Sequence, residues 1–178
     1  MLYFMKPLPN HNIDTKEWKP FIKNQWFRMH FMYFVYGLQI ALLICLIVFG
    51  VWKPLPGFLE ILLFICVFVI HELIHIAVIY KAGDISITRS NIFFWIASGA
   101  VLTKLRFLIF MSLPFIVLTA IPIVLSIFFA GALKNIIIYI MCINSIISGS
   151  DIINTVLIAI KPTGSLFYRG YYKPPINN

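Results

Sequence analysis

Three titratable side chains lie together inside a long apolar stretch, and their spacing is that of a metal site. They are two histidines four positions apart and a glutamate directly after the first: His71, Glu72 and His75. On a helix, residues i and i+4 share a face, so both imidazoles can turn toward one ion while Glu72 projects beside them. This HExxH pattern is typical of zinc held by two histidines with glutamate as general base. We therefore expect Zn²⁺ bound by His71 and His75, with Glu72 as the catalytic residue.

The apolar surroundings favour this interpretation, because ionisable side chains in hydrocarbon are costly and usually functional. Two alternatives remain open from the sequence. The histidines could form hydrogen bonds to neighbouring helices without any metal, or they could hold a haem or line a proton path.

The composition is that of an integral membrane protein. Hydrophobic residues make up 61% of the 178-residue chain and charged residues 11%, against about 25% charged residues in soluble domains. Four apolar segments approach or exceed the roughly 20 residues that a helix needs to cross a bilayer. They cover residues 33–52, 58–80, 105–130 and 135–160. We expect an all-α membrane protein with a four-transmembrane-helix bundle.

Basic residues are unevenly distributed around these segments. Of the 14 lysines and arginines, all except Lys53 and Lys134 precede the first span, lie between the second and third spans or at the very start of the third, or follow the fourth. The positive-inside rule then places both termini in the cytoplasm of a multi-pass protein of the cell membrane. We expect a basic cytoplasmic or interfacial leader (1–32), a membrane domain (33–160) and a cytoplasmic tail (161–178). Basic residues beside apolar spans indicate contact with the lipid bilayer and its anionic headgroups, not with nucleic acid.

The connection between the second and third spans is expected to form a short cytoplasmic hairpin or re-entrant segment. Residues 85–88 alternate apolar and polar side chains, and residues 100–103 are compatible with a strand. An amphipathic surface loop is the alternative for this 85–103 region.

A third metal ligand is needed, because a catalytic zinc usually takes three protein ligands and leaves one position for water. Asp151 is an acidic residue of the fourth span. At a rise of about 1.5 Å per residue it lies at nearly the same membrane depth as the histidine pair. We therefore expect Asp151 to be the third ligand. Alternatively, or in addition, its carboxylate satisfies loose backbone near residues 148–150.

Two asparagines flank Asp151 in the fourth span. Asn154 follows it by three residues, and Asn144 precedes it by about two turns. Either side chain is a candidate to hydrogen-bond a metal ligand or to hold a substrate backbone. Packing between helices is an equally open explanation.

With these motifs, the chain resembles membrane-embedded zinc metallopeptidases of the site-2 protease type. It is more similar to a small bacterial family of four-span proteins described as putative zincin peptidases. The resemblance covers roughly residues 55–160 and rests on three short stretches: 71–75, 102–107 with 113–115, and 144–151. It implies His71, His75 and an aspartate as ligands, Glu72 as base, and a bacterial source. Site-2 proteases have Asp-Gly in their third motif, whereas Asp151 precedes Ile152 here. No PDZ or CBS domain is expected, so the resemblance implies nothing about recruitment or regulation.

The expected function is metal-assisted hydrolysis of peptide bonds near the cytoplasmic face. The substrate would be a membrane protein or a membrane-proximal peptide. The alternative is a non-catalytic zinc-binding membrane scaffold or partner-binding protein. A transporter is disfavoured, because the first span offers only Gln39 as a polar residue for a continuous path. No feature of the sequence indicates an oligomeric state.

Overall fold

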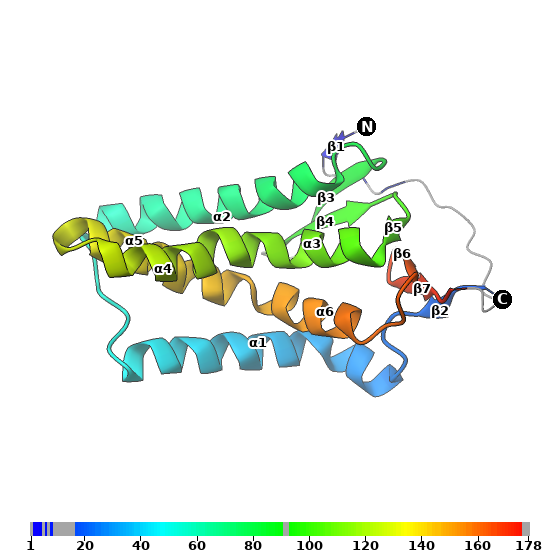
Figure 1. Cartoon of the computed structure of the whole chain (residues 1–178), viewed down its shortest axis with the longest axis horizontal. Helices are drawn as coiled ribbons and strands as arrows, with labels where there is room; N and C mark the ends of the chain where they lie inside the picture. Colours follow the sequence, from blue (N-terminus) through cyan, green and yellow to red (C-terminus); the bar gives the residue numbers. More distant parts are fainter. Residues whose placement is uncertain (1, 5, 7, 9–16, 91–92, 176–178) are drawn as a thin grey trace.

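The computed structural model describes residues 2–4, 6, 8, 17–90 and 93–175. Long helices run side by side, and two small sheets stand together at one end of them (Figure 1). The first and last strands, β1 (Leu2–Phe4) and β7 (Tyr171–Lys173), both belong to this sheet end. Residues 9–16 of the expected leader lie outside the described residues.

The first two helices are each long enough to cross a bilayer. They are α1 (Gln25–Val48), with 24 residues, and α2 (Gly57–Ile79), with 23 residues. Helix α1 begins earlier than the predicted start at residue 33, because Asn24 caps it: the Asn24 side chain accepts a hydrogen bond from the Phe27 amide. The aromatic and basic end of the expected leader is therefore the first part of this helix.

The third span is one helical rod with a change of hydrogen-bond register in its middle. It consists of α3 (Lys104–Phe115), the π-helical segment η1 (Ile116–Ala120) and α4 (Ile121–Phe128), which together make a 25-residue apolar helix. Thr103 caps its start through a hydrogen bond from the Arg106 amide. π-Helical turns inside α-helices are rare and occur frequently at functional sites.

The predicted fourth span is not one continuous helix. It consists of α5 (Gly131–Ile147) and α6 (Gly149–Ala159), which meet at Ser148 with a bend of 61°. Within the described residues, three helices are long and apolar enough to cross a membrane, and there is a fourth span only if the bent pair counts as one. The bend follows from the local sequence, because Ser148 leaves the helical conformation (ψ of 9°) and Gly149 follows it.

Two small sheets correct the all-α expectation to a mostly helical fold. In the first, β3 (Ile85–Ser90) pairs antiparallel with β4 (Phe93–Ser98) and parallel with β1. This strand pair stands where the hairpin or re-entrant segment was expected, and its cytoplasmic placement stays a prediction.

The second sheet has the order β2-β7-β6-β5 and draws on segments far apart in the sequence. Its other strands are β2 (Lys19–Pro20), β5 (Leu102–Thr103) and β6 (Leu166–Tyr168). The turn between β6 and β7 is tight, with positive φ at Arg169 (42°) and Gly170 (79°), as a two-residue hairpin requires. Much of the expected tail is therefore an ordered hairpin.

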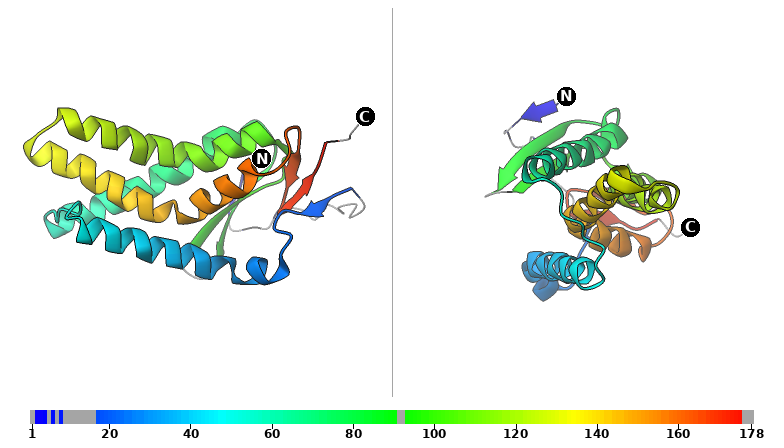
Figure 2. Two further views of the ribbon diagram at one scale, coloured as in Figure 1. Left: turned by 60° about the horizontal axis from the view of Figure 1, so that its bottom comes forward. Right: turned by 90° about the vertical axis from the view of Figure 1, so that its left-hand side faces the viewer.

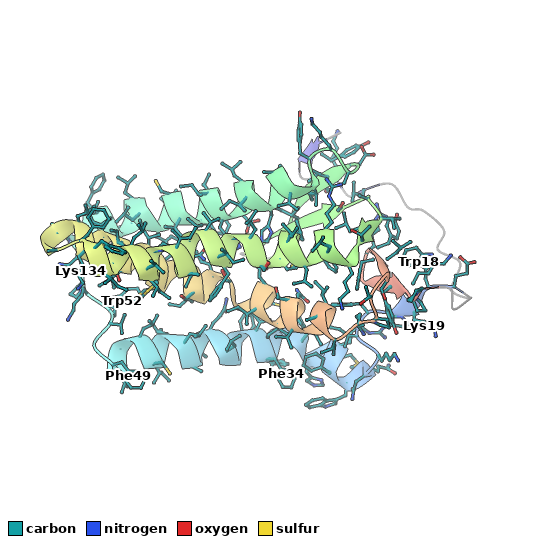
Figure 3. All side chains as sticks on the ribbon, in the orientation of Figure 1. Trp18, Lys19, Phe34, Phe49, Trp52 and Lys134 are labelled. Atoms are coloured by element: carbon teal, nitrogen blue, oxygen red, sulfur yellow. The ribbon has the colours of Figure 1, made fainter. Side chains whose placement is uncertain are left out.

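The helices present apolar side chains outward along most of their length. Phe58 is 81% exposed and Phe49 is 78% exposed, which fits a lipid surrounding. Trp18 and Lys19 mark the sheet end, and Trp52 and Lys134 mark the opposite end (Figure 3). The assignment of the sheet end to the cytoplasm stays a prediction from charge.

Candidate metal centre

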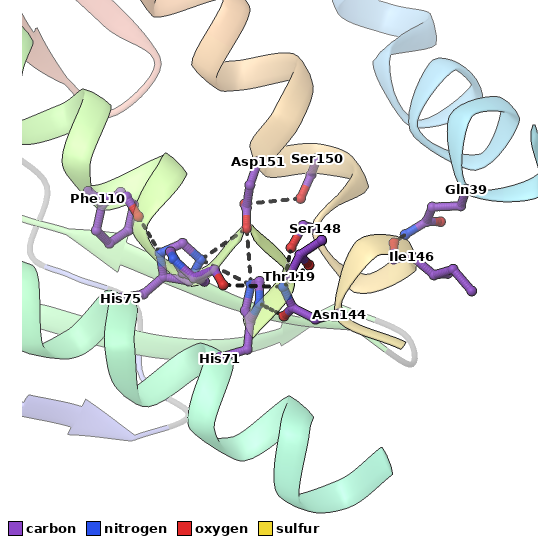
Figure 4. A network of polar contacts seen from close by, with 11 residues as sticks. Gln39, His71, His75, Phe110, Thr119, Asn144, Ile146, Ser148, Ser150 and Asp151 are labelled. Carbon is purple, nitrogen blue, oxygen red and sulfur yellow. Dashed lines mark hydrogen bonds and ion pairs between the residues drawn. The ribbon is translucent and has the colours of Figure 1, made fainter. Parts of the chain in front are cut away.

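The structure brings His71, His75 and Asp151 into direct contact. The Nε2 atom of His71 lies 3.0 Å from Asp151 Oδ2, and the Nε2 atom of His75 lies 3.2 Å from the same oxygen. The two Nε2 atoms are 3.2 Å apart (Figure 4). All three residues are buried, and their ligand atoms could hold a metal ion. Helix α2 supplies both imidazoles from one face, and α6 supplies the carboxylate.

The outer nitrogen of each imidazole has a partner that fixes the tautomer. His71 Nδ1 donates to Asn144 Oδ1 over 2.9 Å, and His75 Nδ1 donates to the Phe110 backbone carbonyl over 2.7 Å. A backbone carbonyl only accepts. The Asn144 Nδ2 group donates to the Pro114 carbonyl over 3.2 Å, and this contact leaves Asn144 Oδ1 facing His71 as an acceptor. Both Nδ1 atoms therefore carry a hydrogen, and each neutral imidazole keeps its lone pair on Nε2.

The chemistry of these atoms fits a bound cation. When both imidazoles are neutral, two nitrogen lone pairs and one carboxylate oxygen converge with no hydrogen between them, an arrangement that is repulsive unless a positive charge lies among them. A proton on one imidazole makes one of the three contacts among these atoms favourable, whereas a metal ion between them can be bound by all three atoms at once. Two histidines and an aspartate are common zinc ligands. Each imidazole also has the second hydrogen bond that zinc-bound histidines almost always make.

The break between α5 and α6 places the carboxylate. Because the chain turns at Ser148, Asp151 falls in the first turn of α6 instead of the middle of a long helix. The backbone N–H groups at a helix start favour a negative charge there. Ser150 Oγ also lies 3.4 Å from Asp151 Oδ1. Residues 148–150, where loose backbone was expected, thus contain the helix break.

Glu72 and Asn154 line a pocket that reaches the metal centre. The pocket has a volume of about 410 Å³, and its wall includes His71, His75 and Asp151. Four residues of α1 also line the pocket: Met32, Val35, Tyr36 and Gln39. Glu72 is therefore next to the proposed ligands, as the spacing predicts. Its role as base stays a prediction.

The two asparagines occupy different positions. Asn144 is fully buried behind the metal centre, where its Nδ2 group lies within hydrogen-bond distance of Pro114 O, Thr119 Oγ1 and Ser148 Oγ. Asn154 lines the pocket beside the metal centre. Asn144 therefore contacts His71 and Asn154 is part of the pocket wall, and the roles expected for both stay predictions.

Three groups that contact the site or its supporting helices were not among the expected site residues. They are the Phe110 carbonyl, Thr119 in η1, and Gln39, whose Nε2 donates to the Ile146 carbonyl at the end of α5 (Figure 4). A backbone carbonyl leaves no signal in residue types. Thr119 and Gln39 are polar residues in apolar spans. Because polar side chains are rare in such spans and often functional, their presence was a signal in the sequence that could have identified them.

A protein-family model described as putative zincin peptidase matches residues 64–166, more than half of the chain. The matched region includes both histidines, Glu72, Asn144 and Asp151. No curated protein and no solved structure matches the chain. The similarity to site-2 proteases therefore stays an expectation from the motifs. On the family match, the chain belongs to the putative zincin peptidase family.

Proposed function

We propose that the protein is a membrane-embedded zinc metalloprotease that hydrolyses a peptide bond of a membrane or membrane-proximal protein. The observation that carries this proposal is the convergence of two imidazole Nε2 atoms and one carboxylate oxygen within 3.2 Å of one another beside a pocket. Membership of a zincin peptidase family and the long apolar helices support the same assignment.

His71, His75 and Asp151 would hold the zinc ion, which when bound supplies Lewis acidity to a peptide carbonyl and to water. Glu72 takes the proton of the attacking water and passes it to the leaving amine. Asn144 and the Phe110 carbonyl keep the two imidazoles in the tautomer that directs Nε2 inward. Asn154 donates a hydrogen bond to the substrate backbone or accepts one from it.

The substrate would lie in the pocket between α1 and α2. These two helices stand apart when the molecule is viewed end-on (Figure 2, right), and α1 packs instead against α5 and α6. Residues of both helices line the pocket. We therefore propose that a segment of a membrane protein enters between α1 and α2.

A second pocket of about 540 Å³ extends the site toward the two sheets. It shares Ile96, Phe110 and Met111 with the first pocket. Ile96 belongs to β4, an edge strand of the described sheet. A helical substrate hides its amide bonds in internal hydrogen bonds, so the cleaved segment must be extended. An extended segment can pair with β4 as an added strand, and in this proposal the sheet end faces the cytoplasm.

The test is Glu72→Gln, compared with Glu60→Gln as a matched control on the same helix. Glu60 Oε1 accepts a hydrogen bond from the Leu55 amide, which glutamine can preserve. Membranes from cells expressing each protein are labelled at new protein N-termini. We expect the wild type and Glu60→Gln to yield the same cleavage products, and Glu72→Gln to yield none while keeping its zinc. Identical products from all three proteins, or a Glu72→Gln phenotype equal to wild type, would support the scaffold alternative instead.

A further inference from the structure

We propose that Pro114 is a positioning residue of the metal centre, acting through the backbone carbonyl of Phe110. Its nitrogen carries no hydrogen, so the Phe110 carbonyl lacks its ordinary intrahelical donor and accepts from His75 instead. The inference rests on the proposed zinc site and adds to it the reason why the His75 ring is held as it is.

The helical register makes Pro114 the residue that matters. In an α-helix the N–H of residue i donates to the carbonyl of residue i−4, so residue 114 is the ordinary donor to Phe110 within α3. Proline removes this donor, and its ring also presses against the carbonyl of residue i−4. The Phe110 carbonyl is instead 2.7 Å from His75 Nδ1 on α2.

The contact decides which His75 nitrogen faces the metal centre. A neutral imidazole has one hydrogen, and its bond to the Phe110 carbonyl keeps that hydrogen on Nδ1. The lone pair is then on Nε2, 3.2 Å from Asp151 Oδ2. The Phe110 ring packs on the same imidazole, with ring centroids 4.6 Å apart. Phe110 therefore fixes both the tautomer and the tilt of this ligand.

An N–H at position 114 would compete with His75 for this carbonyl and draw it back into the helix. The Pro114 carbonyl, which accepts from Asn144 Nδ2, would be retained in any such variant. The hydrogen bond between Asn144 and His71 should therefore persist. The effect is expected at His75 alone, which separates this role of Pro114 from general packing.

The experiment uses the purified full chain with an amide-to-ester pair at position 114. Pro114→Ala introduces a methyl side chain and an N–H. Lactic acid at position 114 introduces the same methyl group with an ester oxygen, and so no N–H. Both leave the same space where the buried proline ring was. Pro122→Ala, at a second buried proline of the same span, is the control for loss of a ring.

Zinc and Co²⁺ affinities are measured by chelator competition, together with the visible spectrum of the Co²⁺-loaded protein. We expect Pro114→Ala to bind about 10–100-fold more weakly, the usual effect of losing a ligand's outer hydrogen bond, and to change the spectrum. The lactic acid variant and Pro122→Ala should bind as the wild type does. If Pro114→Ala does not fold, the lactic acid variant still tests the inference, because weak metal binding by this variant would show that the proline ring itself is required.

Wild-type affinity and spectrum in Pro114→Ala would overturn the inference and leave the zinc site standing. A lactic acid variant as weak as Pro114→Ala would also overturn it, because the ring and not the missing hydrogen would then be responsible. A wild-type protein that binds neither metal would overturn the zinc site together with the inference.

Discussion

Asn144 and His71 are 73 residues apart in the sequence, and their side chains meet over 2.9 Å between Oδ1 and Nδ1. The same Asn144 amide donates to Thr119 Oγ1 over 2.9 Å. It is fully buried. One side chain of α5 therefore links the metal-centre helix α2 to the π-helical segment of the third span.

Asn144→Ala should weaken zinc binding, because His71 would lose the acceptor that fixes its tautomer. We expect affinity to fall about 10–100-fold. The free energy of unfolding should fall by about 1–3 kcal/mol, because buried donors and acceptors lose their partner. Chelator competition and detergent unfolding measure the two effects. Unchanged zinc affinity would show that His71 needs no such partner.

Asn154→Ala should have the opposite profile. Its side chain lines the pocket, and the proposal assigns it to the substrate backbone. We expect unchanged zinc content and a decrease in kcat/KM of about fivefold, equivalent to one hydrogen bond of about 1 kcal/mol. The measurement is kcat/KM on a peptide that spans a cleavage site identified by the N-terminal labelling described above. Loss of zinc in this variant would mean that Asn154 supports the ligands after all.

The bend between α5 and α6 should depend on the fit between Gly149 and Gln39. A Cβ at position 149 would lie 2.8 Å from Gln39 Cγ, and Gln39 Nε2 donates to the Ile146 carbonyl over 3.0 Å. Gly149→Ala should therefore displace Gln39 and cost about 1–3 kcal/mol of unfolding free energy. In a Gln39→Ala background the overlap is absent, so the same change should cost less. A double-mutant cycle of unfolding in detergent measures the coupling; strict additivity would contradict it.

Lys161 should make stability depend on pH in the alkaline range. It follows α6 at the sheet end, where Nζ donates to the Phe21 carbonyl over 2.7 Å. Burial, together with the like charge of Lys23, lowers the pKa of the Lys161 ammonium from its ordinary 10.5. Between the lowered pKa and 10.5 the unfolded chain binds more protons than the folded protein, so the free energy of unfolding rises with pH.

The control for this prediction is Lys161→Arg, because a guanidinium stays charged throughout the range. The melting temperature of the wild type, taken relative to Lys161→Arg, should rise as the pH approaches 10.5. A difference that is constant with pH would show that the ammonium has the same proton affinity in both states.

The cluster of His71, His75 and Asp151, which could hold a metal ion, was predictable because these are rare residue types in an apolar chain. The spacing of His71 and His75 and the membrane depth of Asp151 were sufficient to place the three together. The partner of His75 was not predictable, because a backbone carbonyl has no residue type and its availability depends on the register of another helix.

The second sheet was not expected from the sequence, although residues 100–103 were expected to be compatible with a strand. Strands β2, β5, β6 and β7 have only two or three residues each, too few for an alternating pattern, and the pairs β2–β7 and β5–β6 join segments far apart in the sequence. The start of α1 was placed too late because Arg28 and His30 lower the hydropathy of its first turns, although the Asn24 cap was readable.

The most direct test of the proposed zinc site is the metal content of the purified protein, compared among the wild type, His71→Ala, Asp151→Ala and Glu72→Gln. We expect about one zinc per chain in the wild type and in Glu72→Gln, and little or none in the other two variants. Zinc retained in full by both His71→Ala and Asp151→Ala, or absent from the wild type, would contradict the proposed site.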